Sequence, residues 1–129
     1  MDCIRLINEK DYAPLSLFWA LDGTYLDTKL LYPAESSYVF ERNGEILYAV
    51  AVHLIRGLPV AYVEAVVRNP QKQPDFDALK SLQIYLEEQA KTQGYTKLVG
   101  IPKNERLCNH YEKLGYNRVA SVIYTLKEL

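Results

Sequence analysis

Cysteine is scarce in this chain of 129 residues, which contains only Cys3 and Cys108 and no CxxC pair. A disulfide framework is therefore not expected. With no signal peptide at the start, the expected setting is a reducing cytoplasm with free thiols. Cys108 and His110 could form part of a metal site, but no other Cys/His cluster supplies the remaining ligands. We therefore expect no bound metal.

The chain also lacks the charge pattern and the apolar run that mark two further classes of protein. Its 15 basic and 16 acidic side chains are interspersed and give a formal net charge of −1. No cluster of Lys and Arg provides the surface that a nucleic acid requires. The longest apolar run, ILYAVAVHLI, is too short and too interrupted to span a bilayer. We expect neither a nucleic-acid partner nor a membrane.

The composition that is present is that of one globular domain. Hydrophobic residues make up 49% of the chain and charged residues 24%. No internal repeat or linker divides residues 1–129, so a single domain is expected. Eleven tyrosines, against one tryptophan and three phenylalanines, indicate many rings that are half buried or line a cleft, because tyrosine has an apolar body and a polar tip.

The N-terminal quarter predicts one strand and two helices. Alternating residues predict a strand over Cys3–Ile7. Apolar residues at helical spacing predict a helix that Asp11 caps and Gly23 ends. A second short helix is predicted over Tyr25–Leu31, and it is expected to end before Pro33.

A β-hairpin and a further strand are expected next. Asn43-Gly44, a pair that type I′ turns prefer, separates two β-rich runs. The run after the turn is apolar on both faces, which predicts a central strand covered on both sides. Its expected faces are Ile46, Tyr48, Val50, Val52 and Leu54 on one side and Leu47, Ala49, Ala51 and His53 on the other. Val60–Val67 follows as another buried strand.

The C-terminal half alternates helix and strand. A stripe of Leu79, Leu82, Leu86 and Ala90 predicts a helix from Asp77 to Thr92. A strand over Tyr95–Ile101 precedes a helix that Asn104 caps and that runs to Leu114. The tail RVASVIYTLKEL predicts a last strand. The expected order is therefore β-α-α-β-β-β-α-β-α-β.

This order and the segment NERLCNHYEKLGY, Asn104–Tyr116, resemble the GNAT superfamily of acetyl-CoA-dependent N-acyltransferases. The segment is similar to the family's Asn-(six residues)-Tyr-Glu-Lys-Leu-Gly-aromatic motif, and the order covers the whole chain. The resemblance implies an α/β fold whose mixed, mostly antiparallel central sheet is flanked by helices. It also implies acetyl-CoA as cosubstrate and an amine acceptor, either a small molecule or a protein. Homodimers through the C-terminal strand are common in similar proteins.

By the same resemblance, Asn104 would contact the CoA arm and Tyr111 would protonate the departing CoA thiolate. A phenol suits that role, because its reference pKa is near 10 and that of a thiol is near 8.5. The alternative is structural: Asn104 is an ordinary helix cap, and Tyr111 belongs to a core face with Leu107 and Leu114. Both interpretations stay open.

The family's second signature is changed in this chain. GNAT enzymes usually carry a turn close to Arg-x-x-Gly-x-Gly, whose amides bind the CoA pyrophosphate at a helix N-terminus. Here the segment reads VRNPQKQPDFDALKSL and contains no glycine. Pro70 and Pro74 lack an N–H group, and Asp75 or Asp77 is expected to cap the helix and repel phosphate. The candidate CoA contacts are Val66 and Val67 for the pantetheine and Arg68, Lys72 and Gln73 for the phosphates.

Two further titratable residues, Glu64 and His53, are candidates for the base that deprotonates the amine. Glu64 is placed with Tyr62 and Val66 on an apolar face of the fourth strand, where it is either a base with a raised pKa or a salt-bridged or edge-exposed glutamate. His53 is either a base or a hydrogen-bonded structural residue. His110 is expected to point to solvent or along the rim of the cleft.

Three functions remain compatible with the sequence. The first is an acetyl-CoA-dependent N-acyltransferase that uses Tyr111 and Glu64. The second is a non-catalytic GNAT-like binding or assembly module that has lost CoA binding, as the missing glycines suggest. The third is a small-molecule binder that keeps the cleft but takes another nucleotide or acyl carrier.

Overall fold

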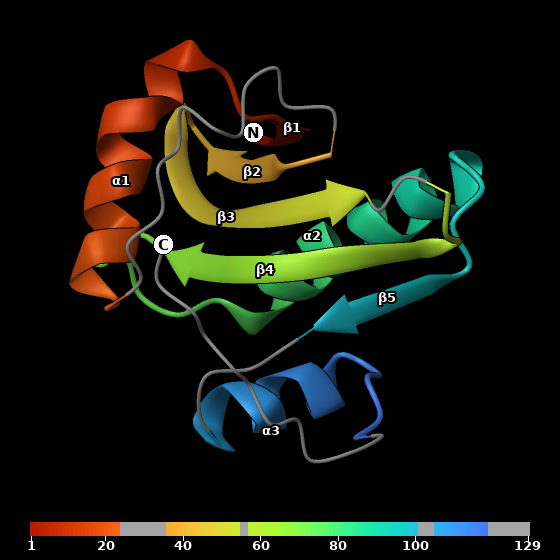
Figure 1. The fold of residues 1–129 in the computed structure, drawn as a ribbon. Helices are drawn as coiled ribbons and strands as arrows, with labels where there is room; N and C mark the ends of the chain where they lie inside the picture. The colour runs from red at the N-terminus through yellow and green to blue at the C-terminus, as the bar shows by residue number, and fades with distance from the viewer. Residues whose placement is uncertain (24–35, 55–56, 101–104, 119–129) are drawn as a thin grey trace, which may run out of the picture.

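The computed structural model describes residues 1–23, 36–54, 57–100 and 105–118, and only the backbone of Glu64, Ala65 and Leu107. The predicted helix at Tyr25–Leu31, Asn104 and the last strand after residue 118 lie outside these ranges. No helix among the described residues is long and apolar enough to cross a membrane. The elements in chain order (Figure 1) are β1 (Asp2–Leu6), the 3-10 helix η1 (Glu9–Asp11), α1 (Tyr12–Leu21), β2 (Tyr38–Arg42), β3 (Glu45–Leu54), β4 (Val60–Arg68), α2 (Phe76–Thr92), β5 (Lys97–Gly100) and α3 (Glu105–Lys113).

The described strands form one sheet in the order β1-β2-β3-β4-β5. The first three neighbouring pairs are antiparallel, and β4 pairs with β5 in parallel. Parallel neighbours need a crossover connection, which α2 supplies between β4 and β5 (Figure 1). The predicted α/β fold with a mixed, mostly antiparallel sheet flanked by helices is therefore confirmed.

The hairpin between β2 and β3 forms as the sequence predicts, with one irregularity. Asn43 and Gly44 both have positive φ, 54° and 80°, as a type I′ turn requires. Beyond the turn, Ile46 pairs with Glu41 while Tyr48 pairs with Phe40, so Leu47 is an extra residue. The strict alternation predicted for this strand is therefore wrong at its start, because a bulge places two successive side chains on one face.

The core has two layers, one on each face of the sheet. Tyr48, Val50 and Val52 of β3 join the cluster that packs under α2, and Ala49 and Ala51 join the cluster that packs under α1. Leu47 packs in the first cluster and Ile46 against the second, as the bulge requires. The central, doubly covered position predicted for this strand is confirmed. The predicted helical stripe is also buried in α2: Leu79, Leu82, Leu86 and Ala90.

The start of the first helix differs from the prediction. Asn8, not Asp11, provides the side-chain cap, since Asn8 Oδ1 accepts a hydrogen bond from Lys10 N at 3.0 Å. The Asp11 carboxylate turns back to accept from Asn8 N at 2.8 Å and from the Arg5 guanidinium at 2.7 and 2.8 Å. This reciprocal capping box starts a 3-10 turn before α1, so Asp11 ends that turn and makes no side-chain cap for α1.

Candidate functional site

A cavity of about 390 Å³ lies where β4, α2 and α3 meet the end of α1. This volume is toward the lower end of the range for small-molecule sites, which are mostly apolar and carry a few polar groups. Its apolar wall includes Tyr48, Val50, Val66, Leu79, Leu82 and Leu86. Its polar groups include Arg68, Gln83, Arg106, His110 and Tyr111. The arrangement is therefore suited to a small ligand that has apolar parts and a few polar groups.

The cavity adjoins the part of β4 that follows its described pairing with β5, and the residues after Gly100 lie outside the described ranges. The β4–β5 pairing runs from Val60↔Lys97 to Val63↔Gly100, whereas β4 continues to Arg68. Within the described ranges, Val66 and Val67 therefore have a partner on β3 but none on β5. Strand backbone that is left open on one side can bind an extended ligand.

Glu64 lies at a bulge just before this stretch. Ala51 pairs with Ala65 and Val52 with Val63, so Glu64 is the extra residue. The register shift brings Val66 to the same cluster as Val63, under α2. The prediction that Val66 shares a face with Tyr62 is therefore wrong, because the bulge interrupts the alternation on which it rested.

Tyr111 comes from the buried face of α3 and is only 4% exposed. Its ring lies so close to β5 that a Cβ atom on Gly100 would be 3.2 Å from Cε2 and 3.3 Å from Cζ. Burial raises the pKa of the Tyr111 phenol well above its ordinary value, and the nearby Tyr116 and Tyr62 add to the effect. The phenol is thus packed as the structural interpretation expects, and it also lines the cavity as the catalytic one expects.

Tyr116 and Gln83 form a polar pair that the sequence analysis missed. Gln83 Nε2 donates to Tyr116 Oη at 2.8 Å and to Glu87 Oε1 at 3.1 Å, and the Tyr116 ring centroid lies 5.0 Å from that of Tyr111. Burial raises the pKa of Tyr116 to about 12, although the Gln83 hydrogen bond acts in the opposite direction. The available signal was a glutamine beside Leu82 on the buried stripe of α2.

The loop between β4 and α2 is closed by its own hydrogen bonds. Asn69 N donates to Leu47 O at 2.8 Å, and Asn69 Nδ2 donates to Ile46 O at 2.9 Å. Asn69 Oδ1 in turn accepts from Gln71 N at 3.0 Å, and Asn69 O accepts from Lys72 N at 3.0 Å. One asparagine therefore fixes the loop both to β3 and to itself.

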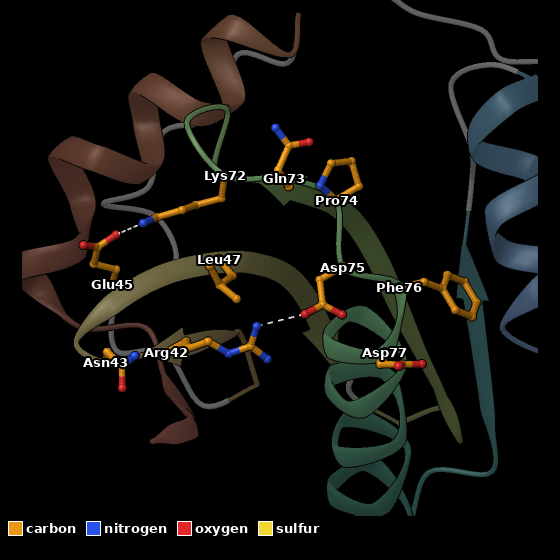
Figure 2. A pocket seen from close by; sticks show the side chains of 10 residues that line it. All are labelled: Arg42, Asn43, Glu45, Leu47, Lys72, Gln73, Pro74, Asp75, Phe76 and Asp77. Atoms are coloured by element: carbon orange, nitrogen blue, oxygen red, sulfur yellow. Dashed lines mark hydrogen bonds and ion pairs between the residues drawn. The ribbon is translucent and has the colours of Figure 1, made fainter.

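A carboxylate occupies the N-terminus of α2. Asp75 is the N-cap, so of the two candidates the structure selects Asp75 over Asp77; its Oδ1 accepts from Ala78 N at 3.1 Å. Its Oδ2 accepts from Arg42 Nη1 at 2.9 Å (Figure 2). The Arg42 hydrogen bond and the helix cap lower the pKa of Asp75, so the carboxylate stays charged. The carboxylate cap that the sequence predicts at this helix start is thus present in the structure.

The three side chains expected to hold phosphates do not converge. Arg68 donates to carbonyl groups of the loop, one of them at 3.2 Å. Lys72 forms an ion pair with Glu45 (Figure 2). Lys72 and Gln73 line a separate hollow of about 540 Å³ at the start of α2, with Asp75 on its wall. Of the three, only Arg68 also lines the Tyr111 cavity.

The structure therefore brings part of the predicted site together. Val66, Val67, Arg68 and Tyr111 line one cavity. Asn104 lies outside the described residues, and only the backbone of Glu64 is described.

The two histidines differ in their relation to this cavity. His53 is exposed and stacks on Tyr62 with ring centroids 6.2 Å apart. His110 lines the cavity, and its Nδ1 is buried with no hydrogen-bond partner in the described part of the chain. Both cysteines are free. No three His, Cys, Asp or Glu side chains among the described residues are grouped to hold a metal.

Solved structures of N-acetyltransferases share this fold across nearly the whole chain. Aminoglycoside N-acetyltransferase AAC(6′)-Iy in complex with CoA has a TM-score of 0.76 at 17% identity, over 98% of this chain and 100% of the other. Ribosomal-protein-alanine N-acetyltransferase from Brucella melitensis has a TM-score of 0.74 at 16% identity, over 99% of this chain and 100% of the other. A transcriptional regulator from Bacillus halodurans has a TM-score of 0.77 at 16% identity, over 98% of this chain and 100% of the other.

The sequence itself matches no protein-family model and no curated protein. At these low identities, the likeness to solved structures establishes the fold and not the activity. The chain has a GNAT-like fold, as the order of its elements and the tyrosine-containing segment predicted.

Proposed function

We propose that this protein is an N-acyltransferase that moves an acyl group, acetyl from acetyl-CoA in the first instance, from a thioester to an amine. The observation that carries the proposal is the cavity that Tyr111 lines together with Val66, Val67 and Arg68 of β4. The GNAT-like fold supports it, because two similar structures are N-acetyltransferases and one of them is in complex with CoA.

The open stretch of β4 would hold the donor. The backbone at Val66 and Val67 offers N–H and C=O groups that have no partner on the β5 side among the described residues. These groups match the amides of a pantetheine arm laid along the strand as an additional neighbour. The thioester carbonyl would then lie near Tyr111 at the far wall of the cavity.

The chemistry needs an amine that has lost a proton and a sulfur that gains one. The amine nitrogen attacks the thioester carbonyl carbon, the C–N bond forms and the C–S bond breaks. Burial raises the pKa of the Tyr111 phenol, so complete proton transfer to a thiolate is uphill. Tyr111 therefore acts as a hydrogen-bond donor that stabilises the charge developing on the departing sulfur, and the thiolate takes its proton from solvent after it leaves. Glu64, at the bulge of β4, is the proposed acceptor of the amine proton.

A thiol-release assay tests the proposal. Acetyl-CoA would be incubated with the protein and a panel of amino sugars, polyamines and short peptides with a free N-terminus. The expected result is amine-dependent release of free thiol, together with an acceptor heavier by one acetyl group. Calorimetry that gives no heat with millimolar acetyl-CoA, together with no thermal shift and no thiol release, would remove the proposal.

The closed loop favours a second candidate, a GNAT-like binding or assembly module without acyl transfer. The amides of the loop and the carboxylate of Asp75 occupy the position where this fold class is expected to bind phosphate. One protein of similar structure is described as a transcriptional regulator. CoA that co-purifies with the protein, or transfer that Tyr111→Phe abolishes, would exclude this candidate.

A further inference from the structure

We infer that the site recognises its donor through the pantetheine thioester arm alone and does not use the adenosine nucleotide of CoA. The inference rests on the proposed function and specifies its substrate class. Free pantetheine thioesters, acyl-CoA and acylated carrier proteins all present this arm, so each contains the group that the site binds.

The first reason is that most of the amides around the start of α2 already donate to protein acceptors. A pyrophosphate at this position would have to displace hydrogen bonds that hold the loop to β3 and begin the helix. Two positions, Pro70 and Pro74, have no N–H group at all. The amides that donate to protein acceptors are those of Asn69, Gln71, Lys72, Asp75 and Ala78.

The second reason is the charge of the hollow beside this loop (Figure 2). Two cations and three carboxylates line it, which leaves a net charge of −1: Arg42 and Lys72 against Glu45, Asp75 and Asp77. Each cation is paired with a carboxylate of the same hollow. A diphosphate here would meet an excess of negative charge and no free counter-ion among the lining residues.

The third reason is the contrast with the Tyr111 cavity. Its wall is built largely from apolar side chains of β3, β4 and α2, and its charged lining side chains are Arg68, Arg106 and Asp22. Of these, Arg68 already donates to carbonyl groups of the loop. A pantetheine arm is uncharged and alternates amide and hydroxyl groups with methylene and methyl groups. It can therefore hydrogen-bond to strand backbone while it fills apolar space.

Calorimetry with three probes tests the inference: CoA, pantetheine, and adenosine 3′,5′-bisphosphate. CoA and pantetheine are expected to bind with dissociation constants within about threefold of each other. The affinity for CoA and the affinity for pantetheine should stay the same between about 0.05 and 0.5 M salt. The adenosine bisphosphate should neither bind nor compete with either ligand. Binding of CoA about tenfold or more tighter than pantetheine, or a CoA affinity that falls steeply with salt, would overturn the inference.

Asp75→Asn provides a matched control. Asparagine is as good an N-cap as aspartate, so the variant removes the charge and keeps the helix start. The ratio of the CoA and pantetheine affinities should not change. An increase in CoA affinity alone would place phosphates beside residue 75 and contradict the inference.

The outcomes separate this inference from the proposed function. If CoA and pantetheine both fail to bind and acetyl-CoA releases no thiol, the proposed function fails and the inference fails with it. If CoA binds and transfers but pantetheine does not bind, the inference alone fails. A holo acyl carrier protein as a further probe identifies the source: binding about tenfold tighter than pantetheine indicates a carrier-bound donor, and equal or weaker binding indicates a free one.

Discussion

The hollow at the start of α2 and the Tyr111 cavity differ in how far their polar groups are paired within the protein. At the start of α2, both cations are paired with carboxylates and most loop amides donate to protein acceptors. The Tyr111 cavity has an apolar wall with a few polar groups, and Val66 and Val67 of β4 line it. Polar groups that are already satisfied stabilise the fold, whereas ligand sites are mostly apolar cavities with a few polar groups. The comparison therefore supports the proposal that the Tyr111 cavity binds the donor.

Of the variants considered, the one that removes the Tyr111 hydroxyl should have the largest effect, a loss of transfer activity. Tyr111→Phe keeps the ring packed on Gly100 and deletes only the hydrogen-bond donor. We expect kcat with acetyl-CoA and an accepted amine to fall about 100-fold, the lower end of the range for acid–base groups, with Tm nearly unchanged. A rate within about twofold of the parent would restrict Tyr111 to packing.

The buried phenols should make stability fall at alkaline pH. The pKa of Tyr116 is raised to about 12 in the folded protein and is near 10 in an unfolded chain. The associated stabilisation, about 2–3 kcal/mol, is fully present below pH 10 and is lost as pH rises from about 10 through 12. Urea unfolding at a series of pH values measures the loss.

Tyr116→Phe is the control for this pH dependence. The variant removes the titrating group, so its stability should decline less than that of the parent across the same pH range. An unchanged decline would show that Tyr116 ionises as easily in the folded chain as in the unfolded one. The variant leaves one N–H of the buried Gln83 amide without its partner while the other keeps its hydrogen bond to Glu87, so the change in stability with pH is compared and not the absolute stability.

A methyl group on Gly100 should disturb the cavity from the β5 side. The Cβ of Gly100→Ala would lie 3.2 Å from the Tyr111 ring, so the ring has to move by a few tenths of an ångström. We expect a loss of about 1–2 kcal/mol in the free energy of unfolding, measured by urea titration, and a lower transfer rate. Ser81→Ala on the exposed face of α2 is the control and should change neither the free energy of unfolding nor the transfer rate.

Variants of the α2 cap should affect stability but not donor binding. Asp75→Ala removes the side-chain cap and the Arg42 partner, and we expect Tm to fall by a few degrees. Asp75→Asn keeps the cap, so its Tm should fall less than that of Asp75→Ala. Differential scanning calorimetry of the two variants gives the comparison, and equal losses would mean that the ion pair, not the cap, supplies the stabilisation.

The smallest effect is expected at Lys72. Its ion pair with Glu45 is solvent-accessible, and such pairs contribute little to stability. Lys72→Ala should leave both Tm and the affinity for CoA unchanged, as thermal shift and calorimetry would report. A marked loss of CoA affinity would restore Lys72 to the phosphate-binding role that the sequence suggested.

Features that depend on local pattern could be predicted from the sequence. The hairpin turn at Asn43-Gly44 and the buried stripe of α2 follow from propensities and spacing within a few residues. The bulges at Leu47 and Glu64 could not be predicted, because each depends on how a neighbouring strand pairs. Asp11 was misplaced because its carboxylate serves an earlier cap and the Arg5 guanidinium.

The candidate site was predictable to a similar extent. Tyr111 and Val66 were indicated by the resemblance to a known motif and by strand order, and they line one cavity. Gln83 was missed because its partner, Tyr116, is 33 residues away in the chain. The orientation of Lys72 follows from the hydrogen bonds of Asn69, which spacing alone does not show.

A crystal structure of the protein with CoA tests the central claim most directly. The predicted result is a pantetheine arm along Val66 and Val67, with its sulfur beside the Tyr111 hydroxyl and no phosphate oxygen on the amides of residues 71–78. Phosphates that accept hydrogen bonds from those amides, or an arm that lies outside the Tyr111 cavity, would contradict the account.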